Sequence, residues 1–251
     1  MKYNTANAKL IKKEEIAKGM FDFVLECPEL SSKAKAGQFA HVAIPGKTLR
    51  RPISICDATD TTLRIVFQVK GEGTEILSQS KVGDEIDILA PLGHGFEIPQ
   101  GKKVAFVGGG IGVPPMLYSA KQASNAIAIL GFRNKDAVIL TEDFEQVCQK
   151  VYVATDDGSF GIHGFTTDVL KTVIDEVDLV CACGPTPMLK ALAGICKENN
   201  TPCQVSLEER MGCGIGACLV CACKTLDKDG NEEHSHVCKK GPVYNAEEVV
   251  W

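Results

Sequence analysis

Four cysteines near the C-terminus constrain the fold of this chain more than any other feature. Three of them are spaced C-x4-C-x2-C in a glycine-rich segment, and sixteen residues separate the third from the fourth: Cys213, Cys218, Cys221 and Cys238. This spacing is typical of the thiolate ligands of a plant-type 2Fe–2S cluster. Such a cluster carries one electron at a time, so the segment predicts a protein that transfers electrons.

Three glycines accompany these cysteines. Gly212, Gly214 and Gly216 lack a side chain, so the backbone can wrap closely around sulfur atoms and direct N–H groups at them. We expect all three to adopt backbone angles that disfavour any other residue.

Other interpretations of the cysteines remain open. Zinc ribbons usually have two compact C-x2-C pairs, and only Cys218 and Cys221 form one here. Disulfides or structural thiols are a further alternative. Cys223 competes for the position of third ligand, although the plant-type spacing favours Cys221. His234 and His236 could indicate a Rieske centre, but no Cys-x-His pair flanks them, so we expect solvated loop histidines.

Composition narrows the class of protein. The 251 residues carry a net charge of −5 without a polybasic run, which argues against a nucleic-acid partner. Twelve scattered cysteines suit reduced thiols better than a small secreted scaffold. The N-terminus lacks the apolar core of a signal peptide, and the longest uncharged run, 104–120, contains four glycines and two prolines. We therefore expect a cytoplasmic protein that does not cross a membrane.

The first hundred residues alternate short β-rich runs with turn residues. The runs are 21–26, 38–44, 63–69 and 85–89, and a further strand is expected to begin near Arg50. Their regular spacing predicts an antiparallel β barrel over residues 1–100.

The pattern changes after Gly101. Apolar strand-like runs alternate with helix-like segments: strands at 104–107, 127–130, 151–154, 179–183 and 204–207, and helices at 115–123, 165–174 and 188–198. This alternation predicts a doubly wound parallel α/β sheet over residues 101–205. Residues 206–251 then form the cluster module.

Two motifs in the barrel region favour a flavin site. One begins the strand expected near Arg50 and the other leads into a helix at 74–80: Arg51, Pro52, Ile53 and Ser54, then Gln68, Val69, Lys70, Gly73 and Thr74. A helix N-terminus can receive a diphosphate, Arg51 can add a bidentate charge, and the Ser54 hydroxyl can approach the flavin. The alternative for the first motif is a charged strand edge.

Glycines at a strand-to-helix turn favour a nucleotide site. The sequence 107–116 departs from G-x-G-x-x-G because residue 113 is valine, yet its glycines still permit close approach of a pyrophosphate or nicotinamide. A second strand is expected to end at the same sheet edge. The candidate residues are Gly109, Gly110, Gly112, Cys183, Gly184 and Pro185. For Cys183, a packed thiol and a catalytic one both remain open. A third strand ends at Asp156 and Asp157, where a simple turn is the alternative.

Together these motifs resemble the ferredoxin–NADP reductase superfamily. The quoted stretches are Arg-Pro-Ile-Ser, Gly-Gly-Gly-Ile-Gly-x-Pro-Pro and Cys-Gly-Pro. The tail from Glu208, with its cysteines and Val237-Cys238-x-x-Gly-Pro-Val, resembles one branch of this superfamily, the electron-transfer subunits of NAD-dependent (type B) dihydroorotate dehydrogenases. The resemblance to this branch covers essentially the whole chain. Ile53 departs from the wider superfamily, in which many members carry a tyrosine that packs on the flavin.

The resemblance implies FAD, a 2Fe–2S cluster and NAD as cofactors. It also implies a hetero-oligomer with an FMN-containing catalytic subunit that oxidises dihydroorotate, whose electrons pass through the cluster and FAD to NAD+. A flavin suits this position because it takes up two electrons and releases them singly. Positioning suffices for hydride transfer, so no catalytic acid or base is expected. Ile215, Leu219 and Val220 are expected either to meet the partner or to pack the module onto the nucleotide domain.

Two rival functions share these features. One is a diaphorase-like subunit of another complex, such as a sulfhydrogenase or a ferredoxin–NADP transhydrogenase. The other is a non-catalytic metal-binding interaction module on a nucleotide-fold scaffold.

Overall fold

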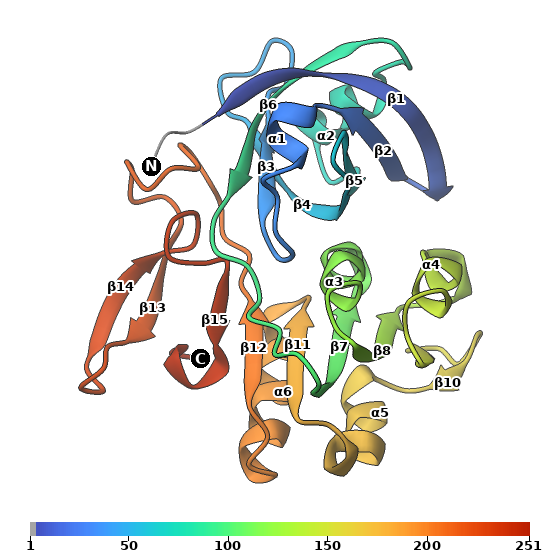
Figure 1. The fold of residues 1–251 in the computed structure, drawn as a ribbon, viewed down its shortest axis with the longest axis vertical. Helices are drawn as coiled ribbons and strands as arrows, with labels where there is room; N and C mark the ends of the chain where they lie inside the picture. The colour runs from blue at the N-terminus through green and yellow to red at the C-terminus, as the bar shows by residue number, and fades with distance from the viewer. Residues whose placement is uncertain (1–3) are drawn as a thin grey trace.

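An antiparallel barrel forms the first part of the fold in the computed structural model, which describes residues 4–251. Six strands close it in the order β1-β2-β5-β4-β3-β6 (Figure 1). Their bounds are β1 Thr5–Ala17, β2 Met20–Glu26, β3 Phe39–Val42, β4 Arg51–Ala58, β5 Thr62–Gln68 and β6 Glu85–Leu92, with short helices α1 Pro28–Ser31 and α2 Glu72–Ser78. The barrel predicted from the spacing of β-rich runs is confirmed.

The inner face of the barrel is apolar because alternate residues of each strand point inward. Phe23, Leu25, Ile55 and Ile65 are among the side chains that fill it. β1 was absent from the predicted strands. Its exposed positions carry lysines and glutamates, so its sequence lacks a strong apolar signal.

A sheet of seven strands forms the second part, in the order β10-β9-β8-β7-β11-β12-β15. Six strands run in parallel, and β15 pairs antiparallel with β12 at the edge. The strands are β7 Lys103–Gly109, β8 Asn125–Phe132, β9 Lys150–Thr155, β10 Ile162–His163, β11 Leu179–Cys183, β12 Cys203–Ser206 and β15 Val243–Asn245. Near-continuous apolar runs in β7, β8 and β11 follow from burial on both faces of the sheet.

Helices cover both faces of this sheet, as a doubly wound fold requires. α3 (Val113–Ala120) and α4 (Thr141–Glu145) pack on the face nearer the barrel (Figure 1). α5 (Thr166–Val173) and α6 (Thr186–Glu198) pack on the opposite face. Short 3-10 turns complete this part: η1 Gly110–Gly112, η2 Lys135–Ala137 and η3 Ile174–Glu176. Within residues 4–251, no helix has the length and apolar character to cross a membrane.

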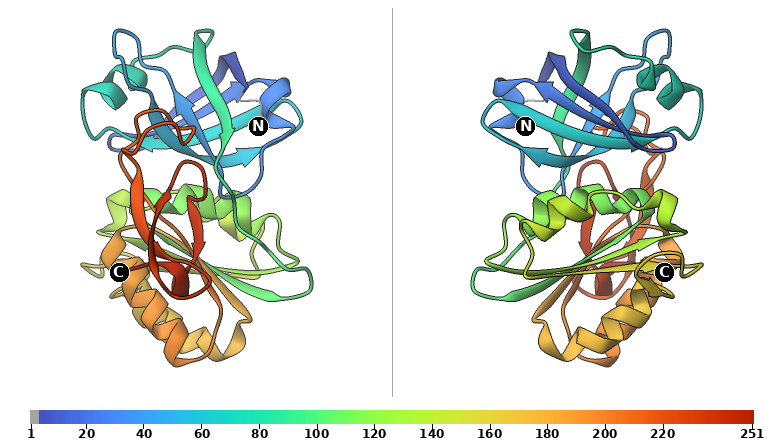
Figure 2. Two further views of the ribbon diagram at one scale, coloured as in Figure 1. Left: turned by 90° about the vertical axis from the view of Figure 1, so that its left-hand side faces the viewer. Right: turned by 90° about the vertical axis from the view of Figure 1, so that its right-hand side faces the viewer.

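The C-terminal segment lies across the junction between barrel and sheet, as the left view of Figure 2 shows. It contains the cysteine loop, a hairpin of β13 (Ala222–Leu226) and β14 (Glu232–His236), β15, and the turn η4 (Ala246–Glu248). β15 completes the edge of the parallel sheet, with Val205 opposite Tyr244. The strand therefore belongs to one sheet with residues of the predicted domain 101–205. The division at 205/206 stays a prediction.

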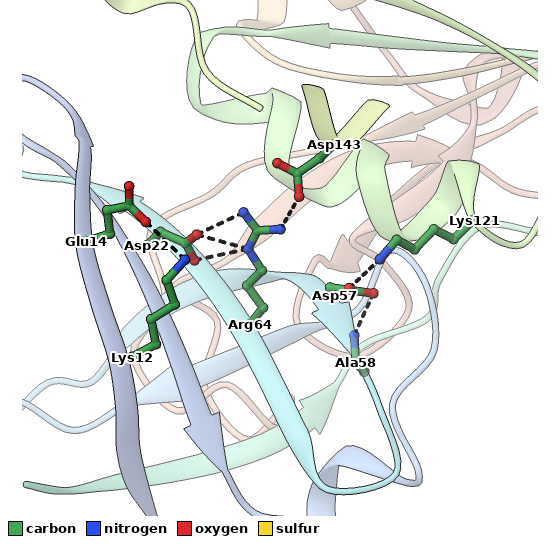
Figure 3. Close-up of polar contacts among 8 residues, drawn as sticks. All are labelled: Lys12, Glu14, Asp22, Asp57, Ala58, Arg64, Lys121 and Asp143. Carbon is green, nitrogen blue, oxygen red and sulfur yellow. Dashed lines mark hydrogen bonds and ion pairs between the residues drawn. The ribbon is translucent and has the colours of Figure 1, made fainter. Parts of the chain in front are cut away.

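Ion pairs join the barrel to the sheet domain (Figure 3). Arg64 of β5 bridges Asp22 of β2, at 2.8 Å, and Asp143 of α4. Lys121, directly after α3, pairs with Asp57 of β4. The carboxyl group of Asp22 is only 1% exposed, so Arg64 compensates a buried charge at this contact.

Candidate cofactor sites

Backbone N–H groups of the cysteine loop converge on sulfur atoms. Cys213 Sγ accepts hydrogen bonds from the N–H groups of Ile215 at 3.5 Å, Ala217 at 3.2 Å and Cys218 at 3.4 Å. Cys238 Sγ accepts one from Gly216 N–H at 3.1 Å. Because N–H donors stabilise negative charge on sulfur, this loop suits thiolates better than neutral thiols.

The four cysteines lie in two pairs. Cys221 Sγ lies 3.2 Å from Cys238 Sγ, and the Cys218 thiol lies within hydrogen-bonding reach of Cys213. In the part of the chain that the structure describes, no group of three or more His, Cys, Asp or Glu side chains is arranged around a single metal position. Two pairs suit a binuclear cluster, with two thiolates for each iron, better than one tetrahedral zinc ion. None of the twelve cysteines, all of which lie among the described residues, forms a disulfide bond.

The two pairs contain thiols of opposite acidity. Burial raises the pKa of Cys213, but the hydrogen bonds from Ile215, Cys218 and Ala217 outweigh burial and lower it to about 6. Burial, followed by the neighbouring Cys221, raises the pKa of Cys238 to about 12. The N–H groups of the loop therefore favour a thiolate at Cys213, whereas burial opposes one at Cys238.

The glycines of the loop divide into two kinds. Gly214 and Gly216 adopt positive φ angles of 72° and 78°, as predicted. The prediction for Gly212 is wrong, because this residue lies outside the positive-φ region. A Cβ at Gly212 would lie 3.3 Å from Cys218 Sγ, so its missing side chain gives room to that sulfur.

The competing ligands lie apart from the two pairs. Cys223 is on β13, and its sulfur lies 3.8 Å from the hydroxyl of Tyr244. His234 is exposed on β14, where it pairs with Lys224 across the hairpin.

Arg51 brings the two candidate flavin motifs together. Its guanidinium lies against Gly73, where a Cβ would come within 2.6 Å of Nε and Nη2. Arg51 donates to the carbonyl oxygen of Leu49 at 2.7 Å, and it forms no ion pair within residues 4–251. Its neighbour Arg50 instead pairs with Asp87 at 2.6 Å. Of the two arginines, Arg51 is the one whose charge no carboxylate among residues 4–251 neutralises, so it is better suited to bind an anion.

The remaining flavin-motif residues differ in role. Thr74 Oγ1 accepts the N–H of Lys70 at 2.9 Å and so holds the turn that begins α2. Gln68 ends β5, and Val69 follows it with its N–H bonded to Gly19. Ile53 is buried in the barrel core, whereas alternation along β4 leaves its neighbours partly exposed on the other side: Pro52 and Ser54.

The two candidate nucleotide motifs meet at the carboxyl edge of the parallel sheet. β7 and β11 are neighbours, with Gly108 opposite Cys183. A Cβ at Gly112 would lie 2.3 Å from the Cys183 carbonyl oxygen, and one at Gly109 would lie 3.1 Å from Pro185. The glycine turn therefore packs backbone to backbone on the second motif, and Gly110 takes a positive φ of 54°.

Other polar residues at this edge have structural roles. Burial raises the pKa of the Cys183 thiol to about 12, so it is a neutral packed thiol. Asp157 accepts hydrogen bonds from Ser159, at 2.9 Å from its N–H and 2.6 Å from its hydroxyl, as in a simple turn. Asp156 bonds through its N–H to Phe132.

Sequence reasoning missed His41, on β3. Its side chain is fully buried, and neither ring nitrogen has a hydrogen-bond partner among residues 4–251. Burial, followed by the charge of Arg50, lowers the pKa of its imidazole to about 4. The sequence contains one signal for this residue, namely a histidine within the otherwise apolar run 39–42.

The chain is similar to several known proteins. The family model described as the iron-sulfur cluster binding domain of dihydroorotate dehydrogenase B matches residues 208–250. A protein of Caldanaerobacter subterraneus subsp. tengcongensis, named "Dihydroorotate dehydrogenase B (NAD(+)), electron transfer subunit", is 44% identical over 97% of this chain and 98% of its own length. A protein of the same name from Bacillus cereus is 41% identical over the same shares.

Solved structures extend the comparison. The structure of an NADH-dependent reduced ferredoxin-NADP oxidoreductase, reported for flavin-based electron bifurcation, matches with a TM-score of 0.87 and 34% identity over 99% of this chain and 91% of that one. A ferredoxin NADP+ reductase from Neisseria gonorrhoeae, 18% identical with a TM-score of 0.66, covers 77% of this chain and 91% of its own and shares the fold. From its sequence relatives, this chain belongs to the family of electron transfer subunits of dihydroorotate dehydrogenase B (NAD(+)).

Proposed function

We propose that this chain is a cytoplasmic oxidoreductase subunit of pyrimidine biosynthesis. It takes electrons from an FMN-containing catalytic subunit that oxidises dihydroorotate and passes them through a 2Fe–2S cluster and FAD to NAD+. The observation that carries the proposal is the 44% identity, along nearly the whole chain, with a relative of that name. The paired cysteines of the loop support it independently.

We assign the four cysteines to the cluster in their pairs: Cys213 with Cys218 on one iron, and Cys221 with Cys238 on the other. The N–H donors to Cys213 and Cys238 support this assignment, because they offset the charge that two thiolates bring to each iron. The partly buried loop positions limit access of water to the sulfurs.

We assign the flavin site to the contact between Arg51 and Gly73. Arg51 would hold the FAD diphosphate. Because Gly73 has no side chain, the guanidinium of Arg51 can lie directly against its backbone. Exposed and partly exposed residues along β4 and around the end of β5 would line the rest of the site: Pro52, Ser54, Gln68, Val69, Lys70 and Thr74. Ile53, which the sequence predicts for this site as well, packs in the barrel core behind them. When bound, the flavin supplies the exchange between a two-electron hydride and single electrons.

We assign the nicotinamide nucleotide to the glycine turn after β7 and the loop after β11. The carboxyl edge of a parallel sheet is where such folds bind ligands. The residues concerned are Gly109, Gly110, Gly112, Cys183, Gly184 and Pro185, and their tight packing supports a rigid backbone surface for the nucleotide. Cys183, as a neutral packed thiol, would position the ligand and not exchange protons with it.

The partner subunit would meet the cysteine loop. Leu219 is 76% exposed and Val220 is 56% exposed, whereas Ile215 packs against the core. Exposed apolar side chains beside the cluster ligands favour a covered, water-poor contact with the electron donor.

The experiment is co-expression with a candidate FMN-containing catalytic subunit. The two chains should co-purify and reduce NAD+ when dihydroorotate is added. The purified single chain should oxidise NADH with artificial dyes but leave dihydroorotate unchanged. Dihydroorotate oxidation by the single chain, or a colourless zinc protein, would contradict the proposal.

A second candidate function has one specific observation in its favour. The NADH-dependent reduced ferredoxin-NADP oxidoreductase covers 99% of this chain at 34% identity. A ferredoxin–NADP transhydrogenase subunit therefore remains the rival. It predicts co-purification with a different partner and reduction of NADP+ by NADH together with reduced ferredoxin, without any response to dihydroorotate.

A further inference from the structure

His41 lies where the barrel contacts the cysteine loop. On β3 it stands opposite Pro52, which belongs to the Arg51–Ser54 motif. Its ring lies directly on Gly214, because a Cβ there would come within 2.5 Å of Nδ1. The buried side chain of His41 thus lies between β4, the strand of the flavin motif that pairs with β3, and Gly214, the residue that follows Cys213.

The position of His41 is fixed on several sides. Its carbonyl oxygen accepts a hydrogen bond from Arg50 at 3.3 Å, and Arg50 is held in turn by Asp87 at 2.6 Å. Apolar residues on the same outer face of the barrel, Phe39 and Leu89, belong to one core cluster with Cys238. The imidazole therefore has little freedom to turn toward water.

The unpartnered ring is the unusual feature. Both nitrogens of His41 are buried, and neither makes a hydrogen bond of normal length among the described residues. Burial lowers the pKa of the imidazole, and the backbone of Arg50 acts to raise it but does not outweigh burial. A neutral imidazole carries one N–H donor and one acceptor, and buried donors almost always have a partner. A ligand that adds an acceptor beside Gly214 would supply what the polypeptide lacks.

We propose that His41 is a positioning residue for the iron–sulfur cluster, with Nδ1–H donating a hydrogen bond to a sulfur atom of the loaded cysteine loop. This inference rests on the proposed function. A hydrogen bond to sulfur stabilises the more negative, reduced cluster more than the oxidised one, so it raises the reduction potential. His41 therefore helps to make the cluster an electron acceptor.

The test compares His41→Leu with His41→Asn in the complex with its catalytic subunit. The two side chains have the same number of heavy atoms, branched at Cγ, but only asparagine keeps an N–H near the position of Nδ1. His234→Asn, on the exposed side of β14, is the matched control. Redox titrations followed by EPR give the cluster potential, and flavin absorbance gives the FAD potential.

Loss of the hydrogen-bond donor should shift the redox equilibrium of the cluster about tenfold toward the oxidised form. For a one-electron couple this equals a fall of about 59 mV in the reduction potential. We expect this shift in His41→Leu, most of it recovered in His41→Asn, and none in the control. An unshifted cluster in His41→Leu, equal shifts in both variants, or a shift in the FAD potential alone would overturn the proposal. The last result would place the hydrogen bond on the flavin.

A measurement on the unmodified chain removes any dependence on how the variants fold. Protein labelled with 15N-histidine should show a 15N hyperfine coupling to the reduced cluster in pulsed EPR. The coupling should disappear in His41→Asn, which loses the labelled ring at position 41 and keeps the other four histidines, including His236. Absence of the coupling in the unmodified chain, or its persistence in His41→Asn, would contradict the proposal. A chain with no cluster signal at all would instead overturn the proposed function.

Discussion

At the scale of single residues, sulfur atoms and N–H groups define the cluster site. Cys213 accepts three backbone N–H groups, and Cys223 faces Tyr244 on the neighbouring hairpin. Sequence spacing already separates these two cysteines, because C-x4-C-x2-C specifies one short loop, and the ligand set itself stays a prediction. It could not identify His41, since the residue that it touches, Gly214, lies far along the chain.

Serine variants test the ligand set. Replacing any one of the four proposed ligands should abolish the EPR signal of the reduced cluster while FAD remains bound: Cys213, Cys218, Cys221 and Cys238. A serine hydroxyl is a harder and far less acidic ligand than a thiol, which accounts for the loss. Cys223→Ser is the control and should retain the signal. A lost signal in Cys223→Ser with a retained one in Cys221→Ser would reassign the third ligand.

Replacement of Arg51 tests the flavin site. A charge-assisted hydrogen bond contributes about 1.5–3 kcal/mol, so Arg51→Ala should weaken FAD retention by roughly tenfold or more. Arg51→Lys should lose less, because it keeps the charge without the planar fork. The flavin content that each variant keeps after extensive dialysis, measured by absorbance, checks this order. Full occupancy in the alanine variant would count against the assignment.

At the scale of elements, the sequence predicts the strands that are apolar throughout, but it does not reveal strands that are charged or short. β7, β8 and β11 are buried on both faces, and their sequences show it. β13 and β14 form a separate two-stranded hairpin of mixed burial without an apolar run, and β15 has only three residues. Their pairing depends on partners distant in sequence, which periodicity does not report.

Gly112→Ala tests the contact between the turn after β7 and the loop after β11. The new Cβ would lie 2.3 Å from the carbonyl oxygen of Cys183, and a backbone atom cannot move aside cheaply. We expect a loss of about 1–3 kcal/mol in the free energy of unfolding. NADH binding should weaken more strongly than that of FAD, which titrations of each ligand would measure.

The matched control for this substitution is Gly194→Ala, in the exposed middle of α6. A Cβ there meets no atom within 4 Å, so alanine should stabilise the helix by about 0.5–1 kcal/mol and leave NADH binding unchanged. Equal behaviour of the two variants would show that the turn tolerates a side chain and that its glycines are not needed for packing.

At the scale of the whole molecule, the sequence does not predict how the barrel, the sheet and the cluster segment contact one another. The order of barrel, sheet and cluster segment followed from successive patterns along the chain. The contacts between them depend on single side chains far apart in sequence, such as Arg64 with Asp143. Burial lowers the pKa of Arg64, but its hydrogen bonds with Asp22 and Asp143 outweigh burial and raise it.

Arg64→Met tests the junction of barrel and sheet domain. It leaves the carboxylate of Asp22, 1% exposed, without its counter-charge, so we expect a loss of about 3 kcal/mol. In a chain of this size that corresponds to a fall in Tm of roughly 6 °C or more. Lys121→Met breaks the more exposed pair with Asp57 and should cost about 1 kcal/mol or less. Calorimetry on both variants would show whether the buried pair is the stronger link.

The pairing of β15 with β12 has a consequence for biosynthesis. The ribosome releases β12 long before β15, and until then β12 presents an open sheet edge, which is a template for association with other chains. The intervening segment contains every proposed iron ligand. Covering that edge therefore has to wait until the whole cysteine loop has left the exit tunnel, so closure of the sheet and the earliest opportunity for metal insertion coincide in time.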